Sequence, residues 1–426
     1  MINQQSLQSV AASAFTEHFC KPLYESYSFS RVPGTIQKLL TQKTGLGTLP
    51  ADTVGDLTQE YEEIVLLFID GFGWRFFEKY RERYPFLKRI LDEGIASKIT
   101  SQFPSTTANH VTCMNTGLEV GESGIYEWFY YEPELDRMIA PLLFSFAGDK
   151  APATLLHAGV SPKQLYPFRT FYQDLKEVGV ASYSLQHDSI VHSPYSQTMF
   201  QGAQQISFKH MQEALEQLVR LLAEQKSQKA YFHFYWGEID AMGHRYGIDS
   251  PQFEDAVEQC FKELEEFFWQ KKVRSGKKSA CILIADHGMI SVDPKKTFYL
   301  NEELPSLLQF IKRNRQGDLI APAGSCRDFF LHIKEEALER VRIQLTQRLQ
   351  GKAAVYLTEE LIKQHFFGSK PPSKNFLDRV GNLVILPYEG EGVWWREKHR
   401  FDQHFYGAHG GLTRGEMETI FLFLPF

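Results

Sequence analysis

Three consecutive hydroxyl side chains, Ser105, Thr106 and Thr107, stand between a proline and a segment of helical character, residues 108–114. The N-terminus of a helix has free backbone N–H groups that attract an anion. A hydroxyl placed there can attack a phosphoryl group that those amides help to bind. Hydroxyl residues in this position are more often helix caps. The segment therefore predicts a nucleophile only if groups of matching chemistry occur elsewhere in the chain.

Carboxylate and imidazole side chains follow two apolar runs. Residues 64–69 (IVLLFI) lead into Asp70, and residues 280–285 (ACILIA) lead into Asp286 and His287. Such runs are typical of parallel strands covered on both faces, and ligands bind at the carboxyl ends of those strands. Asp70 is equally well explained as a turn residue before glycine. Asp286 and His287 are harder to explain by packing, because both need polar partners when buried.

Further ligands of the same kind come later in the chain. An aromatic run, residues 231–236, leads to Asp240 and His244, which are four apart and face the same way on a helix. His409 lies in a glycine-flanked loop, residues 405–411. Mixed carboxylate and imidazole ligands suit two zinc-like metals, which can clamp the attacking and leaving oxygens of a phosphoryl displacement. The candidate set, with one hydroxyl, is Asp70, Thr106, Asp240, His244, Asp286, His287 and His409.

The elements that must position these groups alternate between apolar strand-like runs and amphipathic helices such as residues 253–268. This alternation predicts an α/β fold with a mostly parallel central sheet. We expect residues 1–60 to form a helical preface packed on the core and residues 61–426 to form one catalytic domain. Residues 119–201 have few clean periods and are expected to be an insertion over the active site.

The composition bears on which binding partners and which cell compartment to expect for the protein. The 426 residues carry 46 basic and 52 acidic side chains, a formal charge of -6, so no nucleic-acid partner is expected. Five dispersed cysteines without a CxxC pair indicate a reducing compartment. The first residues lack the pattern of a signal peptide, and no apolar window reaches the length of a membrane span. We therefore expect a cytoplasmic protein without a membrane partner.

Five motifs together resemble those of the alkaline phosphatase superfamily, specifically the type I phosphodiesterase/nucleotide pyrophosphatase family. They are IDGFG from residue 69, FPSTTANH from residue 103, DAMGH from residue 240, ADHGM from residue 285 and AHGG from residue 408. The resemblance runs from about residue 63 to the end of the chain. It implies a three-layer α/β/α sandwich with an inserted cap region.

The resemblance also implies two divalent metal ions, with Zn²⁺ favoured by the ligand types and Mn²⁺ or iron as alternatives. One metal is held by Asp70, Asp286 and His287 and also binds the nucleophile. The other is held by Asp240, His244 and His409.

The nucleophile is one of two adjacent threonines. We prefer Thr106, which lies three residues before Asn109, as the nucleophile does in the TFPNH version of the family motif. Thr107 is the rival. Many members of the family place an asparagine after the following HGI segment, but residues 124–128 read GIYEW. The oxyanion is then expected to rely on the Thr106 and Thr107 amides and on the metals, which leaves the preference for diesters over monoesters open.

The implied function is hydrolysis of a phosphodiester or nucleotide pyrophosphate bond in a small-molecule substrate, through a phosphothreonine intermediate. A phosphomonoesterase or a phosphonate hydrolase could use the same frame. A sulfate-ester hydrolase is a weaker alternative, because that branch uses a modified cysteine or serine. A non-catalytic binding protein is disfavoured, because every ligand position holds a competent residue.

The aromatic run of residues 126–131 (YEWFYY) has two interpretations. Aromatic residues at such a position are usually part of the core. We favour the alternative, in which part of the run lines the leaving-group side of the site and stacks on a base.

Overall fold

A seven-stranded sheet forms the centre of the computed structural model, which describes residues 1–43, 45–224, 228–272 and 276–426. Its order is β2-β18-β9-β1-β8-β6-β7, and all strands run parallel except β18, which is antiparallel to both neighbours. The predicted α/β fold with a mostly parallel sheet is confirmed. The strands are β1 (Glu63–Ile69), β2 (Ile95–Thr100), β6 (Ala181–His187), β7 (Gln204–Phe208), β8 (Ala230–Trp236), β9 (Ser279–Ile284) and β18 (Glu418–Pro425).

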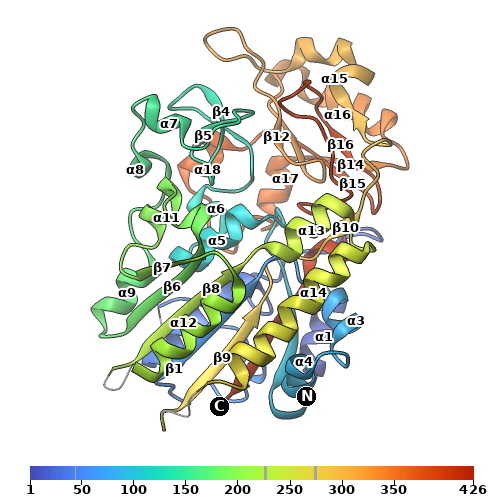
Figure 1. Ribbon diagram of the computed structural model, residues 1–426. Helices are drawn as coiled ribbons and strands as arrows, with labels where there is room; N and C mark the ends of the chain where they lie inside the picture. Colours follow the sequence, from blue (N-terminus) through green and yellow to red (C-terminus); the bar gives the residue numbers. More distant parts are fainter. Residues whose placement is uncertain (44, 225–227, 273–275) are drawn as a thin grey trace.

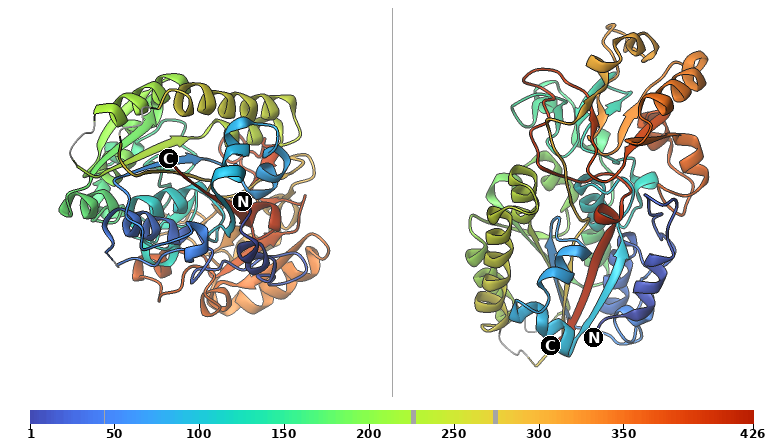
Figure 2. Two further views of the ribbon diagram at one scale, coloured as in Figure 1. Left: turned by 90° about the horizontal axis from the view of Figure 1, so that it is seen from below. Right: turned by 90° about the vertical axis from the view of Figure 1, so that its right-hand side faces the viewer.

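The apolar sequence of strand β1 is explained by burial on both faces of the strand. Ile64, Leu66 and Phe68 point into one hydrophobic core and Val65, Leu67 and Ile69 into the other, so both faces of the strand are covered. Helices α3 (Trp74–Tyr80), α4 (Pro85–Glu93), α12 (Met211–Glu224) and α14 (Pro251–Glu263) cover one face of the sheet. Helices α2 (Val32–Thr41), α5 (Thr107–Thr116), α9 (Phe171–Glu177) and α11 (Pro194–Met199) cover the other (Figure 2).

The start of the chain packs along the edge of the sheet. The described part of residues 1–60 contains α1 (Gln4–Ala11), α2 and two 3-10 turns, η1 (Phe29–Arg31) and η2 (Ala51–Thr53). The Asn3 amide donates to the Ala96 carbonyl, and the Ala96 amide donates to the Met1 carbonyl, both at 2.9 Å. The first residues therefore pair with β2.

The segment 119–201 is only partly an insertion, which corrects the boundary expected from sequence. Strand β6 lies inside the central sheet between β8 and β7. Its sequence, ASYSLQH, lacks an apolar run because Ser182, Ser184 and Gln186 occupy one face, although all three are buried. The remainder holds a small antiparallel sheet of β3 (Tyr130–Glu132), β4 (Arg137–Ala140) and β5 (Ser145–Phe146) and the short helices α6 (Val120–Ser123), α7 (Thr154–His157), α8 (Pro162–Leu165) and α10 (Asp188–Val191).

A second sheet, which the sequence did not predict as a separate unit, lies above the carboxyl ends of the central strands (Figure 1). Its order is β12-β13-β15-β14, it is antiparallel, and it has its own hydrophobic core. Its strands are β12 (Ala323–Gly324), β13 (Phe329–Leu331), β14 (Ala353–Leu357) and β15 (Leu383–Pro387), with helices α16 (Leu338–Arg348) and α17 (Thr358–Lys363) alongside. The small sheet β3-β4-β5 and this second sheet come from separate parts of the chain, and both lie on the side of the strand ends.

The remaining elements are short or link these layers. They are α13 (Glu238–Tyr246), the π-helical turn η3 (Leu264–Trp269), β10 (Ile290–Ser291), β11 (Phe298–Tyr299), α15 (Leu300–Glu303), η4 (Pro305–Phe310), η5 (Glu335–Ala337), α18 (Lys374–Arg379), β16 (Val393–Trp394), β17 (Gly407–Ala408) and α19 (Arg414–Met417). Within the described ranges, no helix combines the length and the apolar character that crossing a membrane requires.

Candidate active site

The carboxyl ends of the parallel strands bring the predicted ligands together. Asp70 directly follows β1, and Asp286 and His287 follow β9, the neighbour of β1. On the other side of β1, strand β8 leads into α13, which carries Asp240 and His244. His409 follows β17, which pairs with β10 in an antiparallel ribbon just after the β9 end. The site therefore forms where crossover connections converge, as in other open α/β sheets.

The first group of ligand atoms belongs to Asp70, Asp286 and His287, and these atoms all lie within 4.8 Å of one another. Nε2 of His287 is 3.5 Å from Oδ1 of Asp70 and 3.2 Å from Oδ2 of Asp286. The other oxygen of Asp286 accepts the amides of Gly71 at 3.1 Å and His287 at 3.0 Å, which fixes the carboxylate. All three side chains are buried.

A second group whose ligand atoms lie within 4.8 Å of one another belongs to Asp240, His287 and His409, and the predicted ligand His244 adjoins it. Nε2 of His244 is 3.4 Å from Oδ2 of Asp240 and 3.0 Å from Nε2 of His409. Nε2 of His409 is 3.5 Å from Oδ1 of Asp240. Both groups adjoin, because the His287 and His409 rings stack with centroids 3.6 Å apart.

Backbone carbonyls orient all three histidines. Nδ1 of His244 lies 2.8 Å from the Gly407 carbonyl, Nδ1 of His287 lies 3.0 Å from that of Gly288, and Nδ1 of His409 lies 2.9 Å from that of Ser105. Assigning the proton to Nδ1 in each ring satisfies these contacts and leaves Nε2 with a free lone pair in the site. Metal-binding histidines use this arrangement.

The acidic groups fit a pair of cations. Within the described residues, neither Oδ1 of Asp240 nor Oδ2 of Asp286 has a hydrogen-bond partner although both are buried. Burial raises the pKa of Asp240 to about 7 and that of Asp286 to about 7, and burial together with the Asp286 charge raises the pKa of Asp70 well above its usual value. Buried carboxylates with free oxygens and imidazoles with free lone pairs are the donor set of divalent zinc-like metals.

Thr107 and not Thr106 faces this cluster, contrary to the preference from sequence. Oγ1 of Thr107 lies 3.3 Å from Nε2 of His287 and 3.5 and 3.4 Å from the two Asp70 oxygens. Thr106 lines a cavity together with Glu127, and no contact of its side chain with these ligands is found among the described residues. Thr106 is the N-cap of α5 and has extended backbone torsions, so helix α5 begins one residue later, at Thr107.

Asn109, whose spacing favoured Thr106 in the sequence, has a structural role in the fold. Nδ2 of Asn109 donates to the carbonyls of Pro104 at 2.6 Å and Tyr126 at 3.1 Å, so this side chain ties two loops together.

The structure adds a contact that no pattern in the sequence indicates. The hydroxyl of Tyr235, at the end of β8, donates to Oδ2 of Asp70. It therefore orients the carboxylate that faces Thr107. Tyr235 stood within an aromatic strand, where packing explains an aromatic residue without any polar role.

One cavity beside Thr107 has a volume of about 530 Å³, and we call it the Tyr195 pocket. It begins at Asp70 and Thr107, and its lining includes residues of helices α10 and α11 and of strands β6 and β8. Its lining includes Val111, Asn115, Trp128, Leu142, Leu143, Gln186, Ile190, Tyr195, Phe200, His233 and Tyr235. Apolar walls with a few amides and hydroxyls are typical of a small-molecule site.

A second cavity on the other side of Thr107 has a volume of about 390 Å³, and we call it the Trp394 pocket. It runs under the second sheet, and its walls include Thr106, Glu127, Trp128, Phe129, His244, Ser325, Trp394, Phe401, Phe405 and His409. Thr107, Trp128 and Asp240 line both pockets. The two pockets thus meet at the candidate nucleophile.

The aromatic run of residues 126–131 divides between the two interpretations offered from sequence. Tyr126 and Tyr130 are fully buried, and their rings stack with centroids 5.3 Å apart. Trp128 is 36% exposed and, with Phe129, lines the Trp394 pocket. Tyr126 and Tyr130 are therefore core residues, whereas Trp128 and Phe129 line a pocket of the site.

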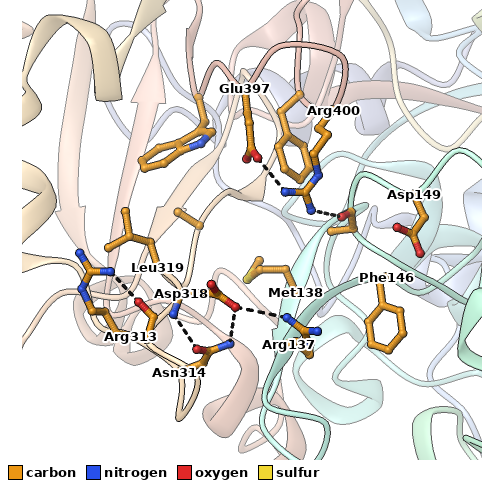
Figure 3. Close-up of a pocket in the computed structure, with 15 residues that line it drawn as sticks. Arg137, Met138, Phe146, Asp149, Arg313, Asn314, Asp318, Leu319, Glu397 and Arg400 are labelled. Carbon is orange, nitrogen blue, oxygen red and sulfur yellow. Dashed lines mark hydrogen bonds and ion pairs between the residues drawn. The ribbon is translucent and has the colours of Figure 1, made fainter. Parts of the chain in front are cut away.

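A third cavity, of about 600 Å³, lies farther out between β4 and the loops around residues 313–321 and 395–401 (Figure 3). Its arginines are already engaged. Arg137 pairs with Asp318 at 3.2 Å, Arg400 pairs with Glu397 at 2.7 Å, and Arg313 donates to the Gly317 carbonyl at 2.6 Å. Arg400 and Phe401 line both this cavity and the Trp394 pocket, so the two cavities adjoin.

Comparisons with known proteins agree with this geometry. The family model for type I phosphodiesterase / nucleotide pyrophosphatase matches residues 64–412. Ectonucleotide pyrophosphatase/phosphodiesterase family member 7 of Mus musculus is 23% identical over 385 residues, which cover 88% of this chain and 80% of that protein. Family member 5 of Homo sapiens is 22% identical over 395 residues, 88% of this chain and 72% of that protein.

Among solved structures, murine ectonucleotide pyrophosphatase/phosphodiesterase 5 shares the fold. An inactive variant, in which a threonine is replaced by alanine, in complex with AMP superposes with a TM-score of 0.63 at 18% identity, covering 86% of this chain and 88% of that one. The human counterpart gives a TM-score of 0.61 at 17% identity. Because the family model spans most of the chain, the protein belongs to the type I phosphodiesterase/nucleotide pyrophosphatase family.

Proposed function

We propose that the protein hydrolyses a phosphodiester or nucleotide pyrophosphate bond with Thr107 as the nucleophile. One observation carries this proposal: the Thr107 hydroxyl faces Asp70 and His287 at the point where the two groups of ligands adjoin. Phosphoryl transfer through a covalent intermediate needs an exposed hydroxyl beside groups that stabilise the charge on phosphorus.

The relatives support the same reaction class. The murine relative of known structure is inactive when a threonine is changed to alanine, and it was solved with AMP. A nucleoside monophosphate is what remains when a nucleotide diester or pyrophosphate is cleaved. We therefore extend to this chain a nucleotide or related small phosphoester as substrate.

Two divalent metals are proposed, one on Asp70, Asp286 and His287 and one on Asp240, His244 and His409, with Zn²⁺ favoured by the carboxylate and imidazole donors. Bound at those places, they would supply Lewis-acid stabilisation of the attacking and leaving oxygens in an in-line displacement. Tyr235 and the backbone amides around Asp286 hold the carboxylates in position for this role.

The reaction then proceeds in two displacements at phosphorus. The Thr107 oxygen forms a bond to phosphorus as the bond to the leaving alcohol or phosphate breaks, which yields a phosphothreonine. Water then attacks that phosphorus from the side that the leaving group vacated, and the Thr107 oxygen departs. The position of Thr107 at the first residue of α5 aims the free amides of the helix N-terminus at the phosphoryl oxygens.

The two pockets favour a diester over a monoester. A diester carries a substituent on each of two oxygens, and the Tyr195 and Trp394 pockets offer a separate cavity for each. A monoester would use one of them. Shape complementarity on both sides of the phosphorus therefore supports the diesterase over the phosphomonoesterase.

The experiment is to compare the metal-replete protein on bis-p-nitrophenyl phosphate, mono-p-nitrophenyl phosphate and dinucleotide pyrophosphates. The proposal expects kcat/KM for the diester and pyrophosphate to exceed that for the monoester. A higher value for the monoester would instead assign the chain to the phosphomonoesterases. No turnover of any phosphoester by protein with full metal content would reject the proposal.

We also propose that the protein works in a reducing compartment, namely the cytoplasm. All five cysteines, Cys20, Cys113, Cys260, Cys281 and Cys326, are buried as free thiols. Fractionation of the native cells with an antibody would test this, and recovery in the extracellular fraction would contradict it.

A further inference from the structure

Glu416 is a fully buried carboxylate to which the proposed reaction assigns no role. It belongs to the short helix α19, which directly precedes β18. Its Oε1 accepts the Gly411 amide at 3.0 Å and Nε of Arg327 at 2.9 Å. Its Oε2 accepts the Thr413 hydroxyl at 2.6 Å and Nη2 of Arg327 at 3.0 Å. Each carboxylate oxygen is therefore shared between Arg327 and the loop that begins at residue 409.

That loop carries the proposed metal ligand His409. Gly411, which donates its amide to Glu416, accepts the Ser105 hydroxyl on its carbonyl at 2.7 Å. The Gly410 amide donates to the same Ser105 hydroxyl at 3.1 Å, and the Ser105 carbonyl lies 2.9 Å from Nδ1 of His409. Glu416 thus holds the loop from one side and Ser105 from the other. The direction of the His409 ring depends on both contacts.

The backbone of Glu416 reaches the other ligand group. Its carbonyl accepts the Gly288 amide at 2.8 Å, and the Gly288 carbonyl lies 3.0 Å from Nδ1 of His287. The packing leaves no room for side chains at two glycines. A Cβ on Gly288 would lie 2.2 Å from the Gly415 carbonyl oxygen, and a Cβ on Gly411 would lie 2.9 Å from Oε2 of Glu416. Glycine at these positions lets α19 approach both ligand loops closely.

Arg327 compensates the charge of Glu416 and ties it to the second sheet. Its fully buried side chain comes from the turn between β12 and β13. The guanidinium also donates to the carbonyls of Pro387 at 3.1 Å and Tyr388 at 3.0 Å. A buried ion pair adds little stability once the loss of hydration is counted, whereas breaking it leaves an uncompensated charge. The role of this pair is therefore explained better by the positions that it fixes than by stability.

From these contacts we propose that Glu416 is a positioning residue for the metal that Asp240, His244 and His409 are proposed to hold. The inference rests on the two-metal site of the proposed function. Loss of a group that orients a ligating imidazole lowers metal affinity about 10- to 100-fold. Glu416 acts on the ring of His409 through the Gly411 amide rather than directly, so we expect a loss near the lower end of that range.

The variant Glu416→Gln separates the two ligand groups. A carboxylate only accepts hydrogen bonds, whereas a glutamine amide turns its NH₂ towards Nε or Nη2 of Arg327 in either orientation, and both of those atoms donate. The side chain therefore cannot keep all its contacts, and the loop of His409 is released on that side. The backbone carbonyl of residue 416 is unchanged and still accepts the Gly288 amide, so the His287 group keeps its anchor.

The test measures the zinc affinities of the full-length protein by competition with chelators of known affinity, which resolves the two equivalents. Glu416→Gln is compared with Arg327→Lys, which keeps the positive charge but cannot make both bonds to Glu416 at once. His409→Ala removes the ligand itself and so identifies which zinc equivalent belongs to its group. Circular dichroism and the melting temperature are recorded for every variant.

The control is Glu132→Gln. Glu132 and Arg379 form another buried ion pair, at 2.7 Å, in which each side chain is 3% exposed. Arg379 also donates to the Gly124 carbonyl at 3.0 Å, outside both ligand loops. This variant breaks a pair of the same kind without touching the support of His409.

We expect the zinc equivalent that His409→Ala removes to bind about tenfold more weakly in Glu416→Gln and in Arg327→Lys, with the other equivalent unchanged. The double variant Glu416→Gln/His409→Ala should bind zinc no more weakly than His409→Ala alone, because both changes act on one site. Glu132→Gln should keep both affinities even where its melting temperature falls.

Unchanged affinity for both zinc equivalents in Glu416→Gln, or in Arg327→Lys should Glu416→Gln not fold, would overturn the inference. An equal loss of zinc affinity in Glu132→Gln would overturn it too, because any broken ion pair would then loosen the site. A wild type that binds fewer than two equivalents of zinc would overturn the two-metal proposal together with this inference. Unchanged variants of a wild type that binds two equivalents would overturn this inference alone.

Discussion

The hydroxyl oxygen of Thr107 lies 3.3 Å from Nε2 of His287, whereas its neighbour Thr106 is the N-cap of α5 and makes no such contact with the ligands among the described residues. One step in sequence therefore separates the side chain that faces the ligand cluster from the one that caps the helix position before it. The chemistry that we propose depends on this difference.

Replacing Thr107 with alanine should lower kcat/KM for a diester by at least about 10³-fold, because it removes the attacking atom. Thr107→Ser keeps a hydroxyl at the same place and should retain measurable activity. Circular dichroism and metal content should match those of the wild type in both variants.

Thr106→Ala is the matched comparison, because it removes the same hydroxyl one residue earlier. It should lower the rate by less than about tenfold, since its hydroxyl makes no capping bond to α5 and no contact with the ligand cluster among the described residues. A collapse of activity in Thr106→Ala with normal rates in Thr107→Ala would reverse our assignment.

Removing the metals should abolish turnover. The imidazoles of His244, His287 and His409 present free Nε2 atoms to the buried carboxylates, so dialysis against a chelator should yield an inactive apoprotein that Zn²⁺ restores at least in part. The His287→Ala variant should bind less metal as well as turn over slowly. Full activity after exhaustive chelation would exclude the two-metal account.

Trp128 lines both pockets and is partly exposed, so its replacement should change substrate preference more than stability. Stacking of a base on such a ring is worth about 1–3 kcal/mol, so Trp128→Ala should lower kcat/KM for nucleotide substrates by about 5- to 150-fold. Bis-p-nitrophenyl phosphate, which has no base, should be affected less.

The buried residue Tyr126 provides the comparison for that experiment. Tyr126→Phe keeps the ring in the core and should leave the nucleotide preference as it is. An equal loss of activity on all substrates in Trp128→Ala, together with a lower melting temperature, would show that Trp128 acts as a core residue.

The stability of the fold should depend on pH through His332, which is 7% exposed. Burial, followed by the charge of Lys312, lowers the pKa of His332 to about 3. The unfolded chain then binds more protons than the folded chain between about pH 6.5 and pH 3, so the free energy of unfolding falls as the pH drops through that window. The expected slope is about 1.4 kcal/mol per pH unit for one such histidine.

His332→Phe should reduce this slope, because phenylalanine cannot bind a proton and can keep the contact with the Tyr131 ring. Urea unfolding of the wild type and the variant between pH 7 and pH 5 measures the effect. Parallel curves over that range would mean that His332 does not titrate as proposed.

Much of the fold and of the ligand set could be predicted from sequence because the signals were strong and local. The continuous apolar runs of β1 and β9 are explained only by burial on both faces, and the residues that follow them, Asp70 and Asp286, had to meet at one sheet edge. The i,i+4 spacing of Asp240 and His244 likewise followed from helix geometry alone.

Other features depended on contacts that a linear pattern does not carry. Strand β6 was missed because Ser184 and Gln186 are buried through hydrogen bonds rather than through apolar character. The choice between Thr106 and Thr107 turns on which residue begins α5, and three hydroxyls in a row leave that boundary open.

The most direct test of the central claim is to trap the covalent intermediate. The metal-replete protein is mixed with a nucleotide diester, quenched in acid within milliseconds, and digested so that the peptide holding residues 103–117 can be sequenced by mass spectrometry. We predict a phosphoryl group on Thr107 in the wild type and none on that peptide in Thr107→Ala. A phosphoryl group on Thr106, or rapid turnover with no phosphorylated peptide, would contradict the account.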